Sequence, residues 1–443
     1  MTDTVDLSSY LTRTRRAEVL VTQGQVHEVV GLLVEVVGLE AATGDRLEAQ
    51  LSDRRLILEV LGFRDGRLLA APLGPTAGVQ RGTPVARRGR GSFIEADPTL
   101  LGRVMDAFGH PLDGRPPPRC RQSVALYREP PPAFARRPIE EQISTGVRVL
   151  DALLPVGRGQ RLGLFAGTGV GKSTLLGMLC RQAKADVVVV GLIGERGREV
   201  GDFVRHALGP EGLAKAVVIA ATSDAPPLVR VQGALRATAV AEYFRDQGKD
   251  VLLLMDSVTR YAMALREATL AAGEPPVTKG YTPSVFASLP ALFERAGNAS
   301  GPGGITAIYT VLVEGDDLQD PIADAVRGTL DGHIVLSRSL AERGVFPAVD
   351  VLASVSRVFG DITPPVHQRA ARRVRDLMAA ARDADDLVKI GAYVRGSDPR
   401  TDAALAQGPA IAELVRQDVH EASDLDDARR RLAQAAGEEP ASS

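Results

Sequence analysis

A glycine-rich stretch at residues 166–174 constrains the fold of this chain more than any other feature. It follows an apolar run at 162–165, precedes a helical pattern over 175–184, and contains Gly167, Gly169 and Gly171 just before Lys172. A strand, a glycine-rich loop and a helix in this order predict a loop whose backbone N–H groups converge on a phosphate at a helix N-terminus. The usual first glycine is Ala166 here. We therefore expect Lys172 at the β- and γ-phosphates of a nucleotide and the Ser173 hydroxyl on Mg²⁺.

Two carboxylates follow other apolar runs and complete a candidate hydrolytic site. Asp256 ends the run 251–255, which is the pattern of an aspartate that holds the Mg²⁺ shell at the carboxyl edge of a sheet. Glu195 follows the run 187–193 within a charged stretch, 194–199. We interpret Glu195 as the base that polarises the attacking water. The alternative interpretation is a solvated charge cluster at a strand end.

Two arginines are candidates for stabilising negative charge on a transferred phosphoryl group. Arg260 lies one helical turn after Asp256, so it can point into the same site. Arg357 follows a predicted strand over 349–354. An arginine near the γ-phosphate can accelerate hydrolysis a thousandfold or more, by about 10³–10⁵. Position alone favours plain surface charge for Arg357, and it does not say whether this residue serves its own site or a neighbour's.

Local composition and apolar periodicity divide the chain into four segments. Residues 1–18 form a docking segment or a loose terminus, and 19–96 contain closely spaced short strands typical of a small barrel or sandwich. Proline runs at 116–118 and 130–132 form a connector. From residue 147 to about 365, apolar runs alternate with helical stretches, which predicts a parallel sheet covered by helices. We assign this sheet to a domain over 97–366. Residues 367–443 are predicted to be helical, with helices over 367–388 and 403–434.

Composition excludes several classes of protein. With 53 Lys and Arg against 55 Asp and Glu, the formal charge is −2, so there is no general footprint for nucleic acid. The two cysteines, Cys120 and Cys180, are too few for a four-ligand zinc site or a disulfide framework. No N-terminal apolar segment resembles a signal peptide, and no apolar run approaches the roughly 20 residues of a membrane helix. We therefore expect a cytoplasmic protein.

Several stretches resemble the ATPases of type III protein secretion, a branch of the family that contains the catalytic subunits of rotary ATPases. Residues 390–405 are more similar to the flagellar export ATPase than to its injectisome relative. Two positions depart from the family pattern: Leu265 replaces a usual glutamine and Thr282 a usual proline. Neither position is expected to take part in hydrolysis, so the two departures affect only the assignment to the flagellar or injectisome branch. The other matching stretches are 102–114, 143–174, 194–200, 255–262, 280–297 and 346–358.

The resemblance implies an α/β fold with a RecA-like P-loop core, an N-terminal small β-barrel and a C-terminal helical domain. It also implies a homo-hexamer with ATP and Mg²⁺ bound between subunits. Arg357 matches an arginine finger supplied by the adjacent subunit, Phe346 matches the aromatic residue that stacks on adenine, and Tyr393 is expected near the base. The remaining matches are catalytic (Lys172, Glu195, Arg196, Arg260), metal-binding (Ser173, Asp256) and nucleotide-binding (Gly167, Thr168, Gly169, Val170, Gly171, Lys172, Ser173, Thr174).

The function implied by the resemblance is ATP hydrolysis that energises flagellar-type protein export, with chaperone release and unfolding and entry of the export substrates. The implied partners are a regulator or stator protein, a central stalk protein, export chaperones with their substrates, and a membrane export gate. The implied location is the inner face of the cytoplasmic membrane, with peripheral attachment only.

Four other functions are alternatives to this one. A catalytic subunit of a rotary ion-translocating ATPase, or an injectisome rather than a flagellar ATPase, stays open; Glu195 argues against a non-catalytic ring subunit. A hexameric RNA motor is disfavoured, because aromatic residues make up 4% of the chain and residues 20–80 hold few beyond Phe63. A purely structural ring protein would lack catalytic residues, and none is missing here.

Overall fold

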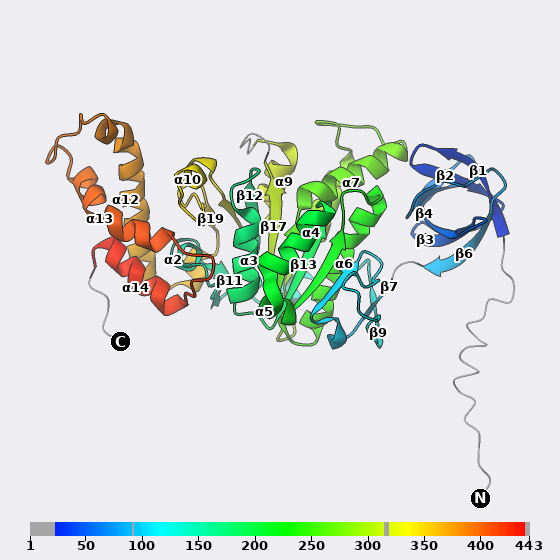
Figure 1. Cartoon of the computed structure of the whole chain (residues 1–443), viewed down its shortest axis with the longest axis horizontal. Coiled ribbons are helices and arrows are strands. Elements are labelled where there is room, and N and C mark those ends of the chain that lie inside the picture. Colours follow the sequence, from blue (N-terminus) through cyan, green and yellow to red (C-terminus); the bar gives the residue numbers. More distant parts are fainter. Residues whose placement is uncertain (1–22, 91–92, 314–318, 439–443) are drawn as a thin grey trace, which may run out of the picture. The chain divides into compact units, whose positions relative to one another are not determined.

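The computed structural model describes residues 23–90, 93–313 and 319–438 (Figure 1). The chain forms two compact units, one of residues 1–92 with 271–273, and a larger one of 93–270 with 274–443. The predicted N-terminal segment 1–18 lies outside the described residues. The predicted domain boundaries at 96/97 and 366/367 stay predictions.

The smaller unit is a closed antiparallel barrel, which confirms the predicted β-barrel. Its core consists of the inward-facing residues of alternating strands, among them Val34, Leu47 and Leu58, which are fully buried. Asp65 and Gly66 both have positive φ between two of the strands, as a two-residue hairpin turn requires. The strand order is β1-β2-β5-β4-β3-β6, with β1 (Gln23–Val30), β2 (Leu33–Val37), β3 (Asp45–Gln50), β4 (Arg55–Arg64), β5 (Arg67–Pro72) and β6 (Pro84–Arg90).

The larger unit is built on a mostly parallel sheet, as the alternating pattern predicts. The strands at its centre are buried along almost their whole length, because helices cover both faces (Figure 1). The sheet order is β19-β18-β12-β17-β15-β13-β14-β8, and β16 pairs with β17. Its strands are β8 (Arg103–Asp106), β12 (Arg161–Ala166), β13 (Val187–Ile193), β14 (Ala216–Ala221), β15 (Asp250–Asp256), β16 (Gly297–Asn298), β17 (Gly304–Leu312), β18 (Gly332–Val335) and β19 (Val355–Ser356).

The predicted strand over 349–354 is wrong. Only Val349 makes an isolated bridge, to Leu336. The Asp350 carboxylate then accepts hydrogen bonds from the backbone N–H groups of Leu352 and Ala353, both at 3.0 Å. This side chain turns the backbone out of the extended conformation, because aspartate readily caps such a turn.

Helices surround the sheet and form the C-terminal part of the chain. The predicted helix over 403–434 is two helices, since Asp424 caps the second one by accepting from the N–H of Asp427. The helices are α2 (Arg148–Leu153), α3 (Lys172–Gln182), α4 (Gly197–Asp202), α5 (Gly209–Ala214), α6 (Pro227–Asp246), α7 (Val258–Ala271), α8 (Pro283–Phe293), α9 (Pro321–Thr329), α10 (Arg338–Glu342), α11 (Phe359–Ile362), α12 (Pro365–Lys389), α13 (Pro399–Val415) and α14 (Leu425–Ala436).

Shorter elements complete the larger unit. A π-helical turn, η3, joins α4 to α5, and two small sheets pair β7 with β9 and β10 with β11. Their bounds are η1 (Pro98–Leu100), η2 (Ala133–Ala135), η3 (Phe203–Leu208), β7 (Phe93–Ala96), β9 (Gln122–Ala125), β10 (Gln142–Ile143) and β11 (Val156–Gly157).

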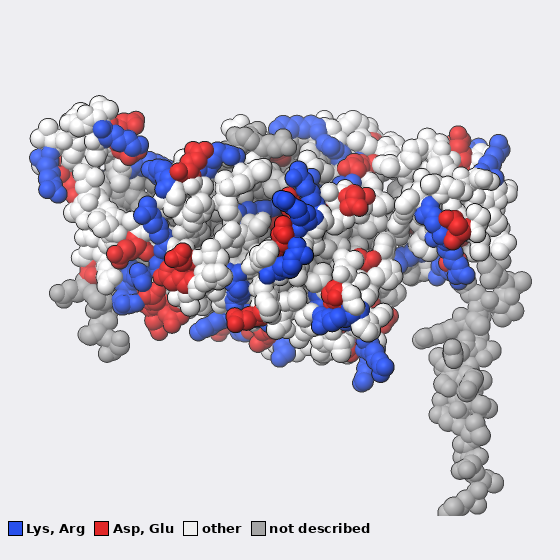
Figure 2. Space-filling model, viewed as in Figure 1, with Lys and Arg blue, Asp and Glu red and all other residues white. Residues whose placement is uncertain are grey.

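The surface carries both signs of charge. On the face drawn in Figure 2, basic and acidic side chains are interspersed, as the near-neutral net charge leads one to expect. Within the described ranges, every helix is too short or too polar to cross a bilayer.

Candidate active site

The predicted phosphate-binding loop leaves the carboxyl end of β12 and enters α3 at Lys172. Gly169 and Gly171 have φ of +80° and +91°, a conformation that side chains with a Cβ rarely adopt. Val170 is buried beneath the loop, while Thr168 and Ser173 are exposed. The first turn of α3 therefore opens its unpaired N–H groups toward solvent, which is a ready site for an anion.

Three charged side chains converge at the end of the loop. The Lys172 ammonium contacts Asp256 Oδ1 directly and lies 3.4 Å from Glu195 Oε1. Asp256 ends β15 and Glu195 follows β13, and these strands are hydrogen-bonded neighbours. Thr310 on β17 donates a hydrogen bond of 2.6 Å to the same Asp256 oxygen. The structure thus brings together three residues that are far apart in the sequence.

Burial and neighbouring charges together set the pKa values of Glu195 and Lys172. It raises the pKa of Glu195 to about 7, against the attraction of Lys172, and the charges of Asp256 and Glu199 add to the increase. Burial opposes the charge on Lys172, but Asp256 and Glu195 outweigh it and the pKa of the amine is raised. Lys172 is therefore a fixed cation, whereas Glu195 gains or loses its proton near neutral pH.

Arg260 lies against the backbone that precedes Glu195. Gly194 has φ +72°, and a Cβ there would lie 2.8 Å from the Arg260 Cβ. Glycine thus permits α7 to approach the end of β13 closely. The Arg260 Nε is buried and has no hydrogen-bond partner among the described residues. A buried donor without a partner is costly, and an oxygen of a bound phosphate would satisfy it.

The first turn of α3 and the end of β15 supply oxygen atoms that suit a magnesium ion. Ser173 presents a hydroxyl at the exposed start of the helix, and Asp256 presents a carboxylate beside Lys172. Magnesium prefers such hard oxygen ligands together with substrate phosphates. The donor set therefore suits Mg²⁺, and the assignment of Ser173 and Asp256 to this ion stays a prediction.

Phe346 lies beside the loop, whereas Tyr393 does not lie beside Phe346. A Cβ at Gly171 would be 3.6 Å from the ring of Phe346, which is 44% exposed. The Phe346 carbonyl accepts a hydrogen bond from the N–H of Gln417, just after α13. Tyr393 precedes α13 and donates to Asp402. The contact of Tyr393 is thus in the first turn of α13, whereas the contact of Phe346 lies just beyond its last residue, Val415, so most of this 17-residue helix lies between the two contacts.

Arg357 and Arg196 lie outside this cluster. The backbone N–H of Arg357 donates to Asp331, and its guanidinium donates to the Arg327 carbonyl at 3.2 Å. Asp331 holds Arg161 at the start of β12, so the six residues of β12, about 20 Å, separate Arg357 from the loop of its own chain. Arg196 extends over the surface, with its side chain 80% exposed and 3.6 Å from Glu199.

Sequence reasoning missed three residues that shape the site. Thr310 lies inside the buried run 304–312. A polar residue in an otherwise apolar strand was the sequence feature that could have indicated its role. Glu199 belongs to the charged stretch that follows β13, where only Glu195 and Arg196 had received a role. Gln417 gave no signal, because its contacts with Arg148 and Phe346 join segments that are distant in the sequence.

Three stretches of the chain match models of known protein families. Residues 26–89 match the beta-barrel domain of the ATP synthase alpha/beta family, and residues 146–356 match its nucleotide-binding domain. Residues 363–434 match the T3SS EscN ATPase C-terminal domain.

Individual relatives align with about nine-tenths of the chain. The flagellum-specific ATP synthase of Pseudomonas aeruginosa is 50% identical over 418 residues, which is 93% of each chain. The type 3 secretion system ATPase of Xanthomonas euvesicatoria is 48% identical over 396 residues, or 89% of each chain. The structure of the assembled ATPase EscN of enteropathogenic E. coli superposes with a TM-score of 0.89 at 42% identity, covering 93% of this chain and 100% of that one. EscN has also been solved in complex with its central stalk EscO, with a TM-score of 0.87 at the same identity and coverage.

Proposed function

The chain belongs to the ATP synthase alpha/beta family, in the branch of flagellar and type III secretion ATPases, and from this premise we propose the roles of its site residues. It is an ATPase that energises flagellar-type export. The observation that carries the residue assignment is the convergence of Lys172, Glu195 and Asp256 at one edge of the sheet.

In the proposed mechanism, positioned charged groups stabilise the transition state, and no covalent bond forms between the protein and the substrate. Lys172 and the N–H groups at the start of α3 bind the phosphates of ATP. Ser173 and Asp256 would hold the Mg²⁺, which would neutralise phosphate charge. Glu195 accepts a proton from the attacking water. Arg260, with its buried unpaired Nε, donates to an oxygen of the γ-phosphoryl group as charge accumulates there.

Loss of the Lys172 ammonium is the first test. Lys172→Ala should weaken Mg-ATP binding at least tenfold, because it removes the phosphate-binding cation and leaves two carboxylates facing the anionic ligand. Binding of a fluorescent ATP analogue measures the effect, with Lys184→Ala, just beyond the end of α3, as the control for loss of a lysine. Unchanged affinity would contradict the phosphate role.

The raised pKa of Glu195 predicts a pH dependence of hydrolysis. A base must be deprotonated to act, so kcat/KM should rise with pH, about tenfold per pH unit, and level off above about 7. Glu199→Gln removes a charge that raises this pKa, so its inflection should move to lower pH while activity is kept. Excess Mg²⁺ keeps the nucleotide as Mg-ATP throughout the pH titration. A profile that is flat from pH 5.5 to 8 would argue against Glu195 as the base.

The assembly proposed for the working enzyme is a homo-hexamer in which Arg357 reaches the site of the adjacent subunit. Its placement far from its own phosphate-binding loop supports this, because only a second copy brings it to such a loop. By analogy with EscN and its stalk EscO, we propose a central stalk as a partner. A regulator protein, export chaperones with their substrates, a membrane gate and attachment at the inner face of the membrane complete the proposal.

A rotary ion-translocating function is the second candidate, and the C-terminal part of the chain argues against it. Residues 363–434 match the C-terminal domain of secretion ATPases rather than a rotary subunit. Cells in which the chain carries Glu195→Gln should therefore stop secreting export substrates while their membrane potential is unaffected.

A further inference from the structure

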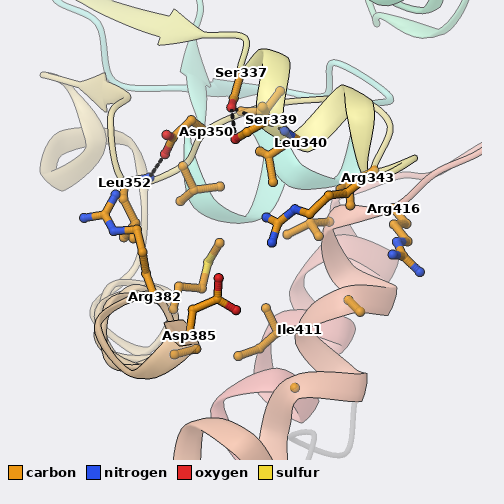
Figure 3. Close-up of a pocket in the computed structure, with 18 of the residues that line it drawn as sticks. Ser337, Ser339, Leu340, Arg343, Asp350, Leu352, Arg382, Asp385, Ile411 and Arg416 are labelled. Carbon is orange, nitrogen blue, oxygen red and sulfur yellow. Dashed lines mark hydrogen bonds between the residues drawn. The ribbon is translucent and has the colours of Figure 1, made fainter. Parts of the chain in front are cut away.

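A cavity of about 570 Å³ lies between the α10 segment and helices α12 and α13 (Figure 3). None of the residues assigned to ATP hydrolysis lines it. Its volume falls within the range of sites that hold small organic molecules, roughly 300–1,000 Å³.

Apolar side chains line the centre of this cavity. Leu340 and Val345 contribute from the α10 segment, Met378 from α12, and Ile411 and Val415 from α13. Ile411 is buried, and Val345, Met378 and Val415 are half-buried, so each still presents some apolar surface to the cavity. A ligand with an apolar body would cover this surface and gain the free energy of removing it from water.

The rim of the cavity is cationic. Four basic residues line it against two carboxylates. The Asp385 carboxylate pairs with Lys389 at 2.5 Å, and Asp350 accepts from two backbone N–H groups. Among the described residues, the guanidinium groups of three remaining arginines have no hydrogen-bond or ion-pair partner: Arg343, Arg382 and Arg416.

Arg343 is the best placed of the three. Figure 3 shows its side chain extending from the end of α10 toward the middle of the cavity, opposite Asp385 and Ile411. Because Asp385 is already paired with Lys389, the excess positive charge at the mouth favours an anion. A guanidinium binds carboxylate, sulfonate or phosphate through paired N–H donors.

The cavity wall is continuous with the nucleotide site. Val345 and Val349, which line the cavity, flank Phe346 in the sequence. The Phe346 carbonyl is bound to the N–H of Gln417, and Arg416 beside it lines the cavity. A ligand in the cavity therefore contacts both segments that fix the position of Phe346.

We propose that this cavity binds a small organic anion with an apolar body, and that its occupancy changes the affinity of the adjacent nucleotide site. The binding itself does not depend on the proposed function, whereas the change in ATP affinity does. By linkage, ATP and the anion must change each other's dissociation constant by the same factor.

The probe for this test is 8-anilinonaphthalene-1-sulfonate, which joins an aromatic body to one sulfonate and fluoresces in apolar surroundings. The full-length protein should bind it with a dissociation constant that Arg343→Gln raises at least fivefold. Ala412→Leu and Ala381→Leu fill the cavity from α13 and from α12, and each should raise that constant at least tenfold. Two independent filling variants keep the test valid where one of them fails to fold.

Matched controls separate the cavity from the rest of the surface. Arg372→Gln, on the exposed face of α12, and Ala406→Leu, on the exposed face of α13, change the same residue types outside the cavity and should leave binding unchanged. Sodium sulfate, at the ionic strength of a sodium chloride control, should not displace the probe. Equal loss of binding in the controls, displacement by sulfate, or no effect of the filling variants would overturn the proposed site.

The effect on the nucleotide site has its own readout. Saturating probe should change the dissociation constant of ATP at least threefold in the unaltered chain, and the change should disappear in Ala412→Leu. ATP should change probe binding by the same factor. Probe binding that leaves ATP affinity unchanged would overturn the coupling, and a chain that binds the probe but not ATP would instead contradict the proposed function.

Discussion

Replacing Glu195 by glutamine should leave ATP bound and reduce its hydrolysis by about 10²–10⁴-fold, the range that general bases contribute. Glutamine keeps the size of the side chain but cannot accept the proton of the attacking water. The carboxylate contacts Lys172 and lies next to Glu199 in a partly buried site. Because Lys172 keeps its contact with Asp256, the phosphate-binding cation stays in place and binding is retained.

Two measurements separate this role from a structural one. Single-turnover hydrolysis gives the rate of the chemical step, and equilibrium binding of labelled ATP gives affinity. Glu199→Gln is the matched control, since it makes the same change four residues later in the half-exposed helix α4. It should retain most of the activity. Equal hydrolysis by Glu195→Gln and the unaltered chain would remove Glu195 from the mechanism.

The sequence predicted the site residues that belong to, or directly follow, a recognisable local pattern. Lys172 belongs to a loop whose glycines must take left-handed backbone angles, and Asp256 and Glu195 each end or follow an apolar run. Parallel strands place their carboxyl ends at one edge of the sheet. Strand order alone therefore brings these residues together, and local patterns were sufficient to find them.

The parts that the sequence did not predict depend on tertiary contacts. Gln417 holds the Phe346 backbone from a loop about 70 residues away (417 − 346 = 71), and no local pattern encodes that contact. The run 349–354 has the apolar character of a strand, but the carboxylate of Asp350 bends it into a turn. Side-chain capping overrode the propensity of the apolar residues.

The open cavity beside α10 had no sequence signal at all. Its walls come from three segments that meet only in the folded chain, and each apolar position on α12 or α13 fits the pattern of an ordinary core helix. A surface that is left uncovered after folding depends on how the helices pack, which periodicity does not specify.

Replacing Arg357 by alanine should lower the rate of ATP hydrolysis by about 10³-fold or more while leaving the fold intact, because an arginine at the γ-phosphate stabilises charge that develops in the transition state. The side chain is exposed, and among the described residues its guanidinium makes one hydrogen bond, to the carbonyl of Arg327, so its loss should cost little stability. Since Arg357 lies at the opposite end of β12 from its own loop, we expect the loss to act on the site of a neighbouring subunit.

Mixing two inactive variants tests whether the arginine acts between subunits. In a ring with mixed Arg357→Ala and Glu195→Gln chains, some interfaces join an intact Glu195 to a neighbour's intact Arg357. Random assembly of equal amounts makes about one interface in four complete, since each position of a cyclic ring takes either chain with equal chance. Activity should then recover toward a quarter of the unaltered rate, and it should rise with protein concentration as rings form.

The control for this mixture is Arg327→Ala with Glu195→Gln, since Arg327 lies beside Arg357 but is paired with Asp324. Arg327→Ala alone should stay active, so its mixture should lose activity only in proportion to the inactive chains. If the Arg357→Ala mixture stays as inactive as each variant alone while the rings assemble normally, Arg357 does not complete a neighbour's site. Full activity of Arg357→Ala alone would exclude any role in hydrolysis. Recovery in the mixture instead assigns each ATP site to two copies of the chain, with Lys172 and Glu195 from one and Arg357 from the next.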